Sequence, residues 1–338
     1  MKKIKTLILC ILIFSLFSTA ACKKNNNKAE IFIYNEQDTF ISKMANSLRD
    51  SFPDNFTLSF HDGKLSQNTQ NEQIVTALDN GCKILVVNMV DRLASASIIE
   101  KAKSENASVI FFNREPIKKH LLTAKNTYYV GTSPVQEGQK QAMIAQKLLG
   151  DPDSMNRLID KNGDNTLQCV FIQGEKDHQD TEHRTYSCIN YLTAIGYRLE
   201  ILAMDFASWN RAQGKALMER YYKEFGSTIE FVFSNNDDMA LGAIDYLLES
   251  NVMASGTPAP FPIVGVDGTK YGLQAVKDGY LYGTIVNDDA AQSEAIVNLC
   301  RYLCGEIKFY EIGFPFTSER YIYIDGPVVT QENIGQYI

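Results

Sequence analysis

The chain lacks several features that mark nucleic-acid-binding, disordered and fibrous proteins. Its 338 residues carry 33 Lys and Arg against 40 Asp and Glu, a net charge of −7, so it has no basic excess for nucleic acid or an acidic membrane surface. Proline and glycine are sparse, at 9 and 21 residues, and 45% of the residues are hydrophobic, which excludes a disordered or fibrous chain. At roughly 100–200 residues per domain, the length predicts two domains.

A long hydrophobic run is also missing at the N-terminus. The run over residues 7–17 is shorter than the about 20 residues that a bilayer-spanning helix needs, and it follows three lysines, as in an export signal. Small residues then lead into Cys22, which looks like the lipobox cysteine of a bacterial lipoprotein, acylated to become the mature N-terminus. We expect a signal peptide over residues 1–21 and a lipidated tether over residues 22–28. A plain secretory signal with an incidental cysteine is the alternative.

Cysteine is present, but it lacks the pairing of a disulfide framework. Apart from Cys10 of the signal and the candidate lipid site, an odd number remains with no recurrent spacing: Cys82, Cys169, Cys188, Cys300 and Cys304. The last two lie four residues apart in a helical-looking segment, and no His pair near them would complete a zinc site. We expect most of these side chains to be buried free thiols.

Short hydrophobic runs alternate with longer amphipathic ones along the rest of the chain. Phe40, Met44 and Leu48 step by four, as do Ile74 and Leu78, which is typical of helices. Strands separated by such helices make parallel βαβ units, and two successive series predict an α/β fold with two doubly wound parallel sheets. The predicted strands cover residues 30–34, 56–60, 84–88, 108–112, 168–172, 199–204, 230–234, 262–266 and 281–286.

Polar side chains follow nearly every predicted strand. Ligands of such sheets bind beyond the carboxyl ends of the strands, so these residues are candidates for a binding site. They are rich in Asn, Asp and Arg, which donate or accept two hydrogen bonds each and therefore suit the hydroxyls of a neutral polyol. Phe40 and the only tryptophan, Trp209, are candidates to pack on the apolar face of a pyranose ring.

Each of these residues also has a purely structural explanation. An Asn or Asp after a strand is most often a helix cap or turn residue, and a lone Trp is most often part of the core. The prediction of a sugar site therefore depends on the whole set and not on any one member.

Nearly the whole mature length resembles the periplasmic galactose/glucose-binding proteins of bacterial ABC sugar importers. The matching segments occur in the same order along the chain: YNEQDTF from Tyr34, VNMVD from Val87, VIFFNREP from Val109, YYVGT from Tyr128, GEKDHQDTEHRT from Gly174, DFASWNRAQGKALM from Asp205, SNNDDMALGA from Ser234, VGVDG from Val264 and GTIVNDD from Gly283.

The resemblance implies a set of sugar contacts that coincides with the residues at the strand ends. The hydrogen-bonding members are Asp38, Asn113, Arg114, His178, Asp180, Arg184, Asn236, Asp267 and Asn287, and the stacking faces are Phe40 and Trp209. Arg114 stands where the family usually has Lys, and a planar guanidinium is not equivalent to an ammonium. The preference between glucose and galactose therefore stays open.

The resemblance also implies a structural calcium ion. Alternate residues of a tight loop point oxygens at a hard cation, with the seventh position contributing its backbone carbonyl. The implied ligands are Asp160, Asn162, Asp164, Thr166 and Gln168 of one loop, completed by the distant Glu230. Asn165 stands at the sharp turn where Gly is preferred, and Asn adopts the left-handed conformation more readily than most residues. A polar loop with no ion is the alternative.

The family architecture implies two lobes joined by a three-strand hinge, the type I periplasmic binding fold. The N-terminal lobe would comprise residues 29–131 and 288–324, and the C-terminal lobe residues 132–287 and 325–338. Sugar would bind between the lobes, and closure of the hinge would bury it. Periplasmic binding proteins are themselves the usual example of such closure.

The implied function is that of a monomeric substrate-binding lipoprotein, held at the membrane only by its lipid, that delivers D-glucose or D-galactose to an inner-membrane ABC permease. A sugar sensor for a chemoreceptor is the alternative within the family. A glycoside-processing enzyme is disfavoured although His178, Asp180 and Glu182 could act in acid–base chemistry, because the chain has no Ser elbow or HExxH motif. The export signal, and the lack of a basic helix-turn-helix before the first lobe, exclude a repressor.

Overall fold

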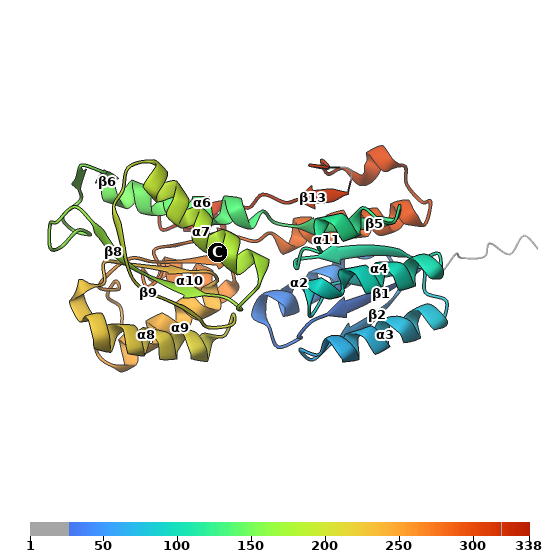
Figure 1. Cartoon of the computed structure of the whole chain (residues 1–338), viewed down its shortest axis with the longest axis horizontal. Coiled ribbons are helices and arrows are strands. Elements are labelled where there is room, and N and C mark those ends of the chain that lie inside the picture. Colours follow the sequence, from blue (N-terminus) through green and yellow to red (C-terminus); the bar gives the residue numbers. More distant parts are fainter. Residues whose placement is uncertain (1–26, 319) are drawn as a thin grey trace, which may run out of the picture.

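The computed structural model describes residues 27–318 and 320–338, which form two lobes side by side along the long axis of the molecule (Figure 1). The predicted signal peptide and Cys22 lie outside the described residues. The first strand begins at Asn27, so Asn27 and Lys28 belong to a sheet and not to the expected tether. Within the described parts of the chain, no helix is both long and apolar enough to cross a membrane.

Each lobe is built on a six-stranded sheet. In the N-terminal lobe the strand order is β13-β5-β4-β3-β1-β2, and all neighbours are parallel. In the C-terminal lobe the order is β14-β12-β11-β10-β8-β9, with β14 antiparallel to β12 and the other neighbours parallel. This confirms the predicted fold of two doubly wound sheets.

The strands of the N-terminal lobe are β1 (Asn27–Ile33), β2 (Phe56–Asp62), β3 (Ile84–Val87), β4 (Ser108–Phe112), β5 (Thr127–Gly131) and β13 (Tyr321–Tyr323). Those of the C-terminal lobe are β8 (Leu167–Gln173), β9 (Leu199–Phe206), β10 (Phe231–Ser234), β11 (Ile263–Asp267), β12 (Gly283–Val286) and β14 (Val328–Thr330), beside a small hairpin of β6 (Gly150–Asp151) and β7 (Ser154–Met155). All nine predicted strands are present. The prediction missed β5, β13 and β14 as well as the two-residue strands β6 and β7; apart from β5, which has five residues, the missed strands are at most three residues long.

Helices cover both faces of each sheet. In the N-terminal lobe α2 (Thr39–Ser51) and α11 (Asp289–Leu303) pack on one face, and α3 (Gln67–Asp79), α4 (Ser95–Ser104) and α5 (Lys118–Leu121) on the other. In the C-terminal lobe α8 (Arg211–Phe225), α9 (Asp237–Glu249) and α10 (Lys270–Lys277) pack opposite α6 (Pro134–Leu149) and α7 (Gln179–Ala194). Because both faces are covered, the central strands β3, β4, β8, β10 and β11 are buried throughout, whereas the edge strands β2 and β9 are partly exposed.

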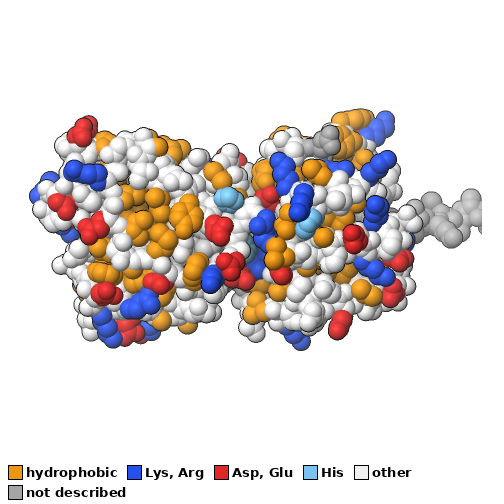
Figure 2. Space-filling model, viewed as in Figure 1, with side chains coloured by type: hydrophobic (Ala, Val, Ile, Leu, Met, Phe, Trp, Pro, Cys, Tyr) orange, Lys and Arg blue, Asp and Glu red, His pale blue; other side chains and the backbone are white. Residues whose placement is uncertain are grey.

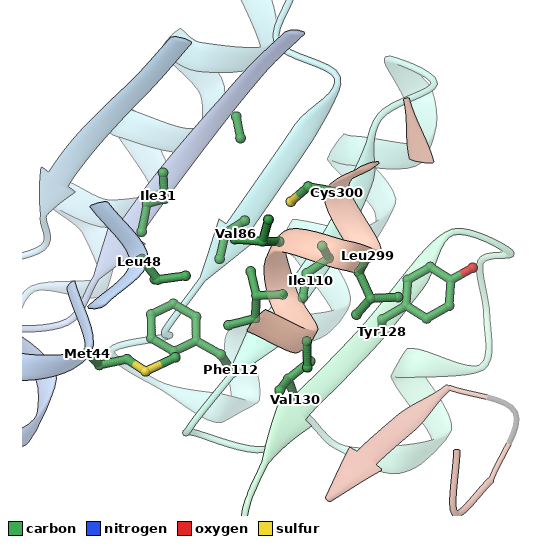
Figure 3. Packing of buried hydrophobic residues seen from close by; sticks show 14 of the residues in the cluster. Ile31, Met44, Leu48, Val86, Ile110, Phe112, Tyr128, Val130, Leu299 and Cys300 are labelled. Atoms are coloured by element: carbon green, nitrogen blue, oxygen red, sulfur yellow. The ribbon is translucent and has the colours of Figure 1, made fainter. Parts of the chain in front are cut away.

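One core of the N-terminal lobe shows how distant parts of the sequence meet. Met44 and Leu48 of α2 and Leu299 of α11 converge on Ile110 and Phe112 of β4 (Figure 3). All five side chains are buried, so α11, from late in the chain, completes a core that begins near residue 30. The cysteines of the described residues are free thiols, and all but Cys304 are buried.

The chain passes between the lobes three times. It leaves the N-terminal lobe after β5 and enters α6, returns after β12 into α11, and leaves again after β13 to form β14. Each lobe is therefore assembled from separate stretches of sequence. Because the strands of each sheet are parallel, the loops that follow β1, β3 and β4 face those that follow β8, β10 and β11 across the interlobe groove.

Candidate ligand-binding cleft

Loops from both lobes meet around a narrow cavity between them, lined by polar and aromatic side chains. Its lining residues are Tyr34, Asp38, Phe40, Ile41, Asn113 and Arg114 of the N-terminal lobe and His178, Asp180, Arg184, Trp209, Asn236 and Asp267 of the C-terminal lobe. The structure thus brings together every predicted sugar contact except Asn287. Figure 2 shows acidic and basic side chains facing each other across this groove.

Several lining residues also cap a helix whose N-terminus points at the cleft. Asp38 caps α2 through one carboxylate oxygen, and the other oxygen accepts a hydrogen bond from the Tyr34 hydroxyl at 2.5 Å. Asn236 caps α9 by accepting the Met239 N–H at 2.9 Å. The structural and the binding explanations of these residues are therefore compatible, because the cap fixes the side chain at the cavity wall.

His178 is held as a neutral hydrogen-bond donor. Its Nδ1 accepts the Asp180 N–H at 3.1 Å as the cap of α7, and its ring meets the Trp209 ring edge-on at 5.2 Å between centroids. Burial, reinforced by the guanidinium groups of Arg114 and Arg184, holds the pKa of His178 well below its usual range. The proton of the neutral ring is therefore on Nε2, where it can be donated to a ligand.

Arg184 is fixed by buried partners. Its Nε donates to the Glu137 carboxylate at 2.6 Å, its Nη1 donates to the Asn235 carbonyl at 2.9 Å, and its Nη2 lies 3.8 Å from Asp180. The guanidinium also lies 5.7 Å from the centroid of the Trp209 ring. Burial raises the pKa of Asp180 to about 7, although the nearby Arg184 opposes the change. Glu137, which sequence reasoning missed, thus positions the arginine for the cavity.

Asn113 is oriented by groups behind the cavity wall. Its side-chain oxygen accepts the amide of the buried Asn88 at 3.0 Å, and its carbonyl accepts the Tyr129 hydroxyl at 2.8 Å. These bonds leave the NH₂ group of Asn113 as the donor available to a ligand. Asn88 ends a predicted strand, and its sequence position alone does not show that it acts through Asn113.

Backbone strain gathers around the cleft. Asn113, Asp177, Trp209 and Asp267 have positive φ angles of 57°, 62°, 62° and 114°. Such residues cost of order 1–3 kcal/mol each and concentrate at functional sites. Gly174 must be glycine, because a Cβ there would lie 2.1 Å from the Trp209 ring. The strain and the close approach both fix the walls of the cavity. Burial also raises the pKa of the Asp267 carboxyl well above its usual range.

Arg114 is clamped in place and joins the two lobes. Its Nη1 donates to the Val90 carbonyl at 2.6 Å, and its guanidinium carbon lies 3.9 Å from the centroid of the Tyr34 ring. Its Nη2 forms an ion pair with Glu175 of the C-terminal lobe at 2.7 Å. The partners Tyr34 and Glu175 were not predicted, although both lie within the matching segments. Two of the guanidinium donors are thus engaged by the protein itself.

Asn287 lies beside the cavity and does not line it. Its N–H donates to the Asp267 carbonyl at 3.0 Å, and its side-chain oxygen accepts the amide of Gln292. It is 2% exposed. Its expected sugar contact stays a prediction, and the contacts in the structure are those of a residue that supports Asp267.

Most of the oxygens expected to hold calcium lie in one loop before and at the start of β8, and Glu230, directly before β10, contacts this loop. Asn162 and Gln168 both donate to Asp164, and Glu230 accepts the backbone N–H groups of Lys161 and Gln168 at 2.6 and 3.2 Å. Asp160 accepts the N–H of Gly163 at 2.8 Å, and Thr166 donates its own N–H to Asp164. Asn165 has a φ of 59°, the left-handed conformation expected at its turn.

The residues expected to hold calcium hydrogen-bond to one another and to backbone N–H groups, and two further features bear on a cation. Among the described residues no three carboxylate, His or Cys side chains converge as a metal cluster, so amide and backbone oxygens would supply part of the shell. The guanidinium of Arg157 lies 3.3 Å from Asp160 and covers Gly163. A cation would therefore have to share Asp160 with Arg157.

The comparisons with known proteins agree with this architecture. A family model described as a periplasmic binding protein domain matches residues 30–307. The chain belongs to this family. It is 32% identical to the D-galactose/methyl-galactoside binding periplasmic protein MglB of Haemophilus influenzae, over 100% of both chains. It is 25% identical to the ribose import binding protein RbsB of Salmonella typhimurium, over 84% of this chain and 86% of that protein.

A solved structure shows the same fold. It is an ABC transporter solute binding protein from Bacillus halodurans with bound myo-inositol, similar with a TM-score of 0.76 at 22% identity, over 93% of this chain and 98% of that one. The periplasmic binding proteins are exported substrate-binding components of transport systems and not enzymes, and this protein is one of them.

Proposed function

We propose that this protein captures a monosaccharide, D-glucose or D-galactose, between its lobes and delivers it to an ABC permease in the inner membrane. The observation that carries the proposal is the cavity wall, where planar polar side chains from both lobes surround two aromatic faces, those of Phe40 and Trp209. The similarity to the Haemophilus influenzae protein supports the choice of hexose.

The chemistry of the wall suits a neutral, hydroxyl-rich ligand. Asp38, Asp180 and Asp267 offer carboxyl oxygens, while Arg184 and the Nε2–H of His178 donate. A sugar hydroxyl donates and accepts at once, so it can bridge an acidic and a basic group. Opposite charges in the wall offset each other, which favours a neutral polyol over an ion.

The placement of ligand contacts on both lobes also explains why ligand binding would close the lobes. A ligand that contacts Asp38 and Asn113 of one lobe and His178 and Asp267 of the other is bound fully only when the lobes are together. Its binding energy therefore shifts the protein toward the closed form. The permease would recognise that form and accept the sugar when the lobes separate.

A calorimetric titration with glucose, galactose, ribose and myo-inositol tests the proposal. We expect binding heat with one of the hexoses and much weaker heat with the others. Asp38→Asn keeps a capping oxygen but removes the charged acceptor, so it should weaken hexose binding. Asp288→Asn changes the corresponding cap of α11 and is the matched control. Absence of heat with both hexoses would overturn the proposal.

Arg114→Lys tests the origin of the sugar preference. The ammonium cannot pair with Glu175, donate to Val90 and cover Tyr34 in the same geometry as the guanidinium. We expect the ratio of the glucose and galactose dissociation constants to change. An unchanged ratio would show that Arg114 holds the lobes and does not select the sugar.

We further propose that the loop from Asp160 to Gln168 binds a structural calcium ion together with Glu230. A ligand that binds only the folded state raises the melting temperature, so chelation should lower it and added Ca²⁺ should restore it, with Mg²⁺ as the control. Arg157→Gln frees Asp160 and should tighten calcium binding. An equal melting temperature with chelator and with Ca²⁺ would contradict calcium binding and show that the loop is a polar loop with no ion.

The same proposal includes a lipid on Cys22 that keeps the protein at the membrane. Mass spectrometry of the N-terminal peptide should show an acylated cysteine, and Cys22→Ser should release the protein into the soluble fraction. An unmodified cysteine would contradict the lipid anchor and favour a plain secretory signal peptide.

A further inference from the structure

The outer end of the N-terminal lobe carries both the start of β1 and an aromatic turn. The strands of this sheet are parallel and their carboxyl ends face the cleft, so their amino ends lie at the opposite end of the lobe. The side chain of Asn27, the first described residue, donates to Glu306 at 2.5 Å. Glu306 stands three residues before the turn Phe309–Ile312, so the chain enters the lobe beside this turn.

Large hydrophobic side chains are exposed at this end of the lobe. Phe309 is 51% exposed, Tyr310 is 74% exposed, and Leu122 on the neighbouring loop is 50% exposed. We call these three residues the aromatic corner. The backbone next to Leu122 is tied to the same region because Arg320 donates to the Leu121 carbonyl at 3.0 Å. Figure 2 shows hydrophobic and basic side chains next to each other at this outer end.

Phe309 is packed on one side although it is half exposed. It stacks on Phe316 with ring centroids 5.1 Å apart and meets the Tyr302 ring edge-on at 5.7 Å. Phe316 in turn lies against Tyr128 of β5 at 6.3 Å. The Phe309 ring is therefore supported from the lobe side, and its remaining surface is exposed.

The charges around the corner suit a phospholipid surface. Lys308 lies 5.8 Å from the centroid of the Tyr310 ring, and Lys125 is exposed on the loop of Leu122. The acids of the turn are engaged by the protein: Glu306 accepts from Asn27, and Glu311 accepts the Lys308 N–H at 2.7 Å. Tyrosine and phenylalanine flanked by lysine are typical of the interface between lipid headgroups and acyl chains. The corner thus combines exposed apolar side chains with two exposed lysines, beside two carboxylates that accept hydrogen bonds from the protein.

The length of the tether decides which face can reach the bilayer. If Cys22 is acylated, residues 22–26 span at most about 17 Å before β1 begins. Helix α11, which runs from the hinge toward the outer end, is itself about 22 Å long. The lipid therefore holds the outer end of the N-terminal lobe, and not the cleft, against the membrane surface.

We propose that the aromatic corner, Leu122, Phe309 and Tyr310 with Lys125 and Lys308, contacts the phospholipid bilayer and orients the anchored protein. This inference rests on the proposed lipid at Cys22. The contact places an aromatic wedge at the headgroup level, while the cleft stays in the aqueous space with its lining residues accessible to sugar.

Depth-dependent fluorescence quenching tests the inference on the full lipidated protein. Tyr310→Trp places an indole in the corner, and Tyr271→Trp places one at a comparably exposed tyrosine of the C-terminal lobe, 62% exposed. Both variants are incorporated into phosphatidylcholine/phosphatidylglycerol vesicles with and without bromine on the acyl chains. We expect bromine to quench the indole at position 310 at least about twofold more than that at 271, after subtraction of the Trp209 signal measured in the unsubstituted protein.

The possible outcomes distinguish failure of the lipid anchor from failure of the aromatic corner as a membrane contact. If the protein does not sediment with the vesicles at all, the lipid anchor fails. If it sediments but bromine quenches both positions equally, the anchor holds and the aromatic corner is overturned as a membrane contact. A combined Phe309→Ser and Leu122→Ser variant in the Tyr310→Trp background should lose the extra quenching. Quenching at position 310 that appears only when the permease is present would assign the corner to the permease and also overturn the inference.

Discussion

Single side chains at the cleft each perform two tasks. Asp38, His178 and Asn236 accept backbone N–H groups as helix caps while they line the cavity. Truncation of such a residue would remove a helix cap as well as a ligand contact, so the measured loss of affinity would include both effects. A side chain that lines the cavity without capping a helix allows the ligand contact to be measured alone.

Trp209 is such a residue, and Trp209→Ala should weaken sugar binding by about 2–4 kcal/mol, because it removes a stacking face and leaves a hole beside Gly174. Calorimetric titration of the hexose measures the loss. Tyr186→Ala, on an exposed ring of the same lobe that does not line the cavity, is the control and should leave the dissociation constant unchanged. If both variants bind as tightly as the parent, Trp209 is a core residue.

The buried carboxyl of Asp180 makes stability depend on pH. Burial raises its pKa from 3.8 to about 7, so the folded protein holds this proton more tightly than the unfolded chain does. The stabilisation is complete below about pH 4 and is lost as the pH rises to about 7. At about 1.4 kcal/mol per pH unit it amounts to about 4 kcal/mol at most.

Asp180→Asn removes this dependence. Relative to the parent, the sugar-free variant should therefore gain unfolding free energy as the pH rises from 4 to 8, measured by urea denaturation. His178, whose pKa is lowered, changes stability in the opposite direction, but it is present in both proteins. A difference between variant and parent that stays constant over this range would contradict the prediction.

At the scale of elements, the packing of α6 on α7 sets the position of Arg184. A Cβ at Gly138 of α6 would lie 2.2 Å from the Arg184 carbonyl oxygen and 2.2 Å from the Ser187 hydroxyl. The two helices can approach this closely only because residue 138 has no side chain.

Gly138→Ala should therefore push α7 outward, costing about 1–3 kcal/mol of unfolding free energy, and should also weaken sugar binding by displacing Arg184. Denaturant unfolding and titration measure the two effects. Gly335→Ala meets no atom within 4 Å and serves as the control. Destabilisation without any change in affinity would show that Arg184 does not move with its helix.

The strands and the strand-end residues could be predicted from the sequence because their signals are local. Buried parallel strands read as hydrophobic runs, and ligands of such sheets bind where those strands end. The supporting contacts could not be predicted. Glu137, Asn88 and Glu175 act through residues 25 to 61 positions away, and only the packed structure places Glu137 on Arg184 or Glu175 on Arg114.

At the scale of the whole molecule, polar contacts between the lobes support the closed arrangement. Besides the Arg114–Glu175 ion pair, the Thr39 hydroxyl donates to Asp238 at 2.5 Å and the Gln179 amide donates to Glu115 at 2.8 Å. These contacts involve no ligand, so they lower the free energy of the closed form whether or not sugar is present.

Glu175→Gln should shift the sugar-free protein toward the open form. Glu175 is 44% exposed, so the ion pair contributes at most about 1 kcal/mol, and the sugar dissociation constant should rise about two- to fivefold. Small-angle scattering without sugar should show a larger radius of gyration. Glu249→Gln breaks a comparable pair with Lys215 inside one lobe and is the control. Equal effects of the two variants would rule out the interlobe role.

The three passages of the chain between the lobes also bear on when each lobe can be completed. The N-terminal lobe lacks its helix α11 and its edge strand β13 until nearly the whole chain has been synthesised. Until then the face of β3 and β4 that α11 covers lacks its partner helix, so the N-terminal lobe cannot complete its core. The interleaved topology therefore ties completion of the first lobe to the last part of the chain, whereas the C-terminal lobe lacks only β14 before that point.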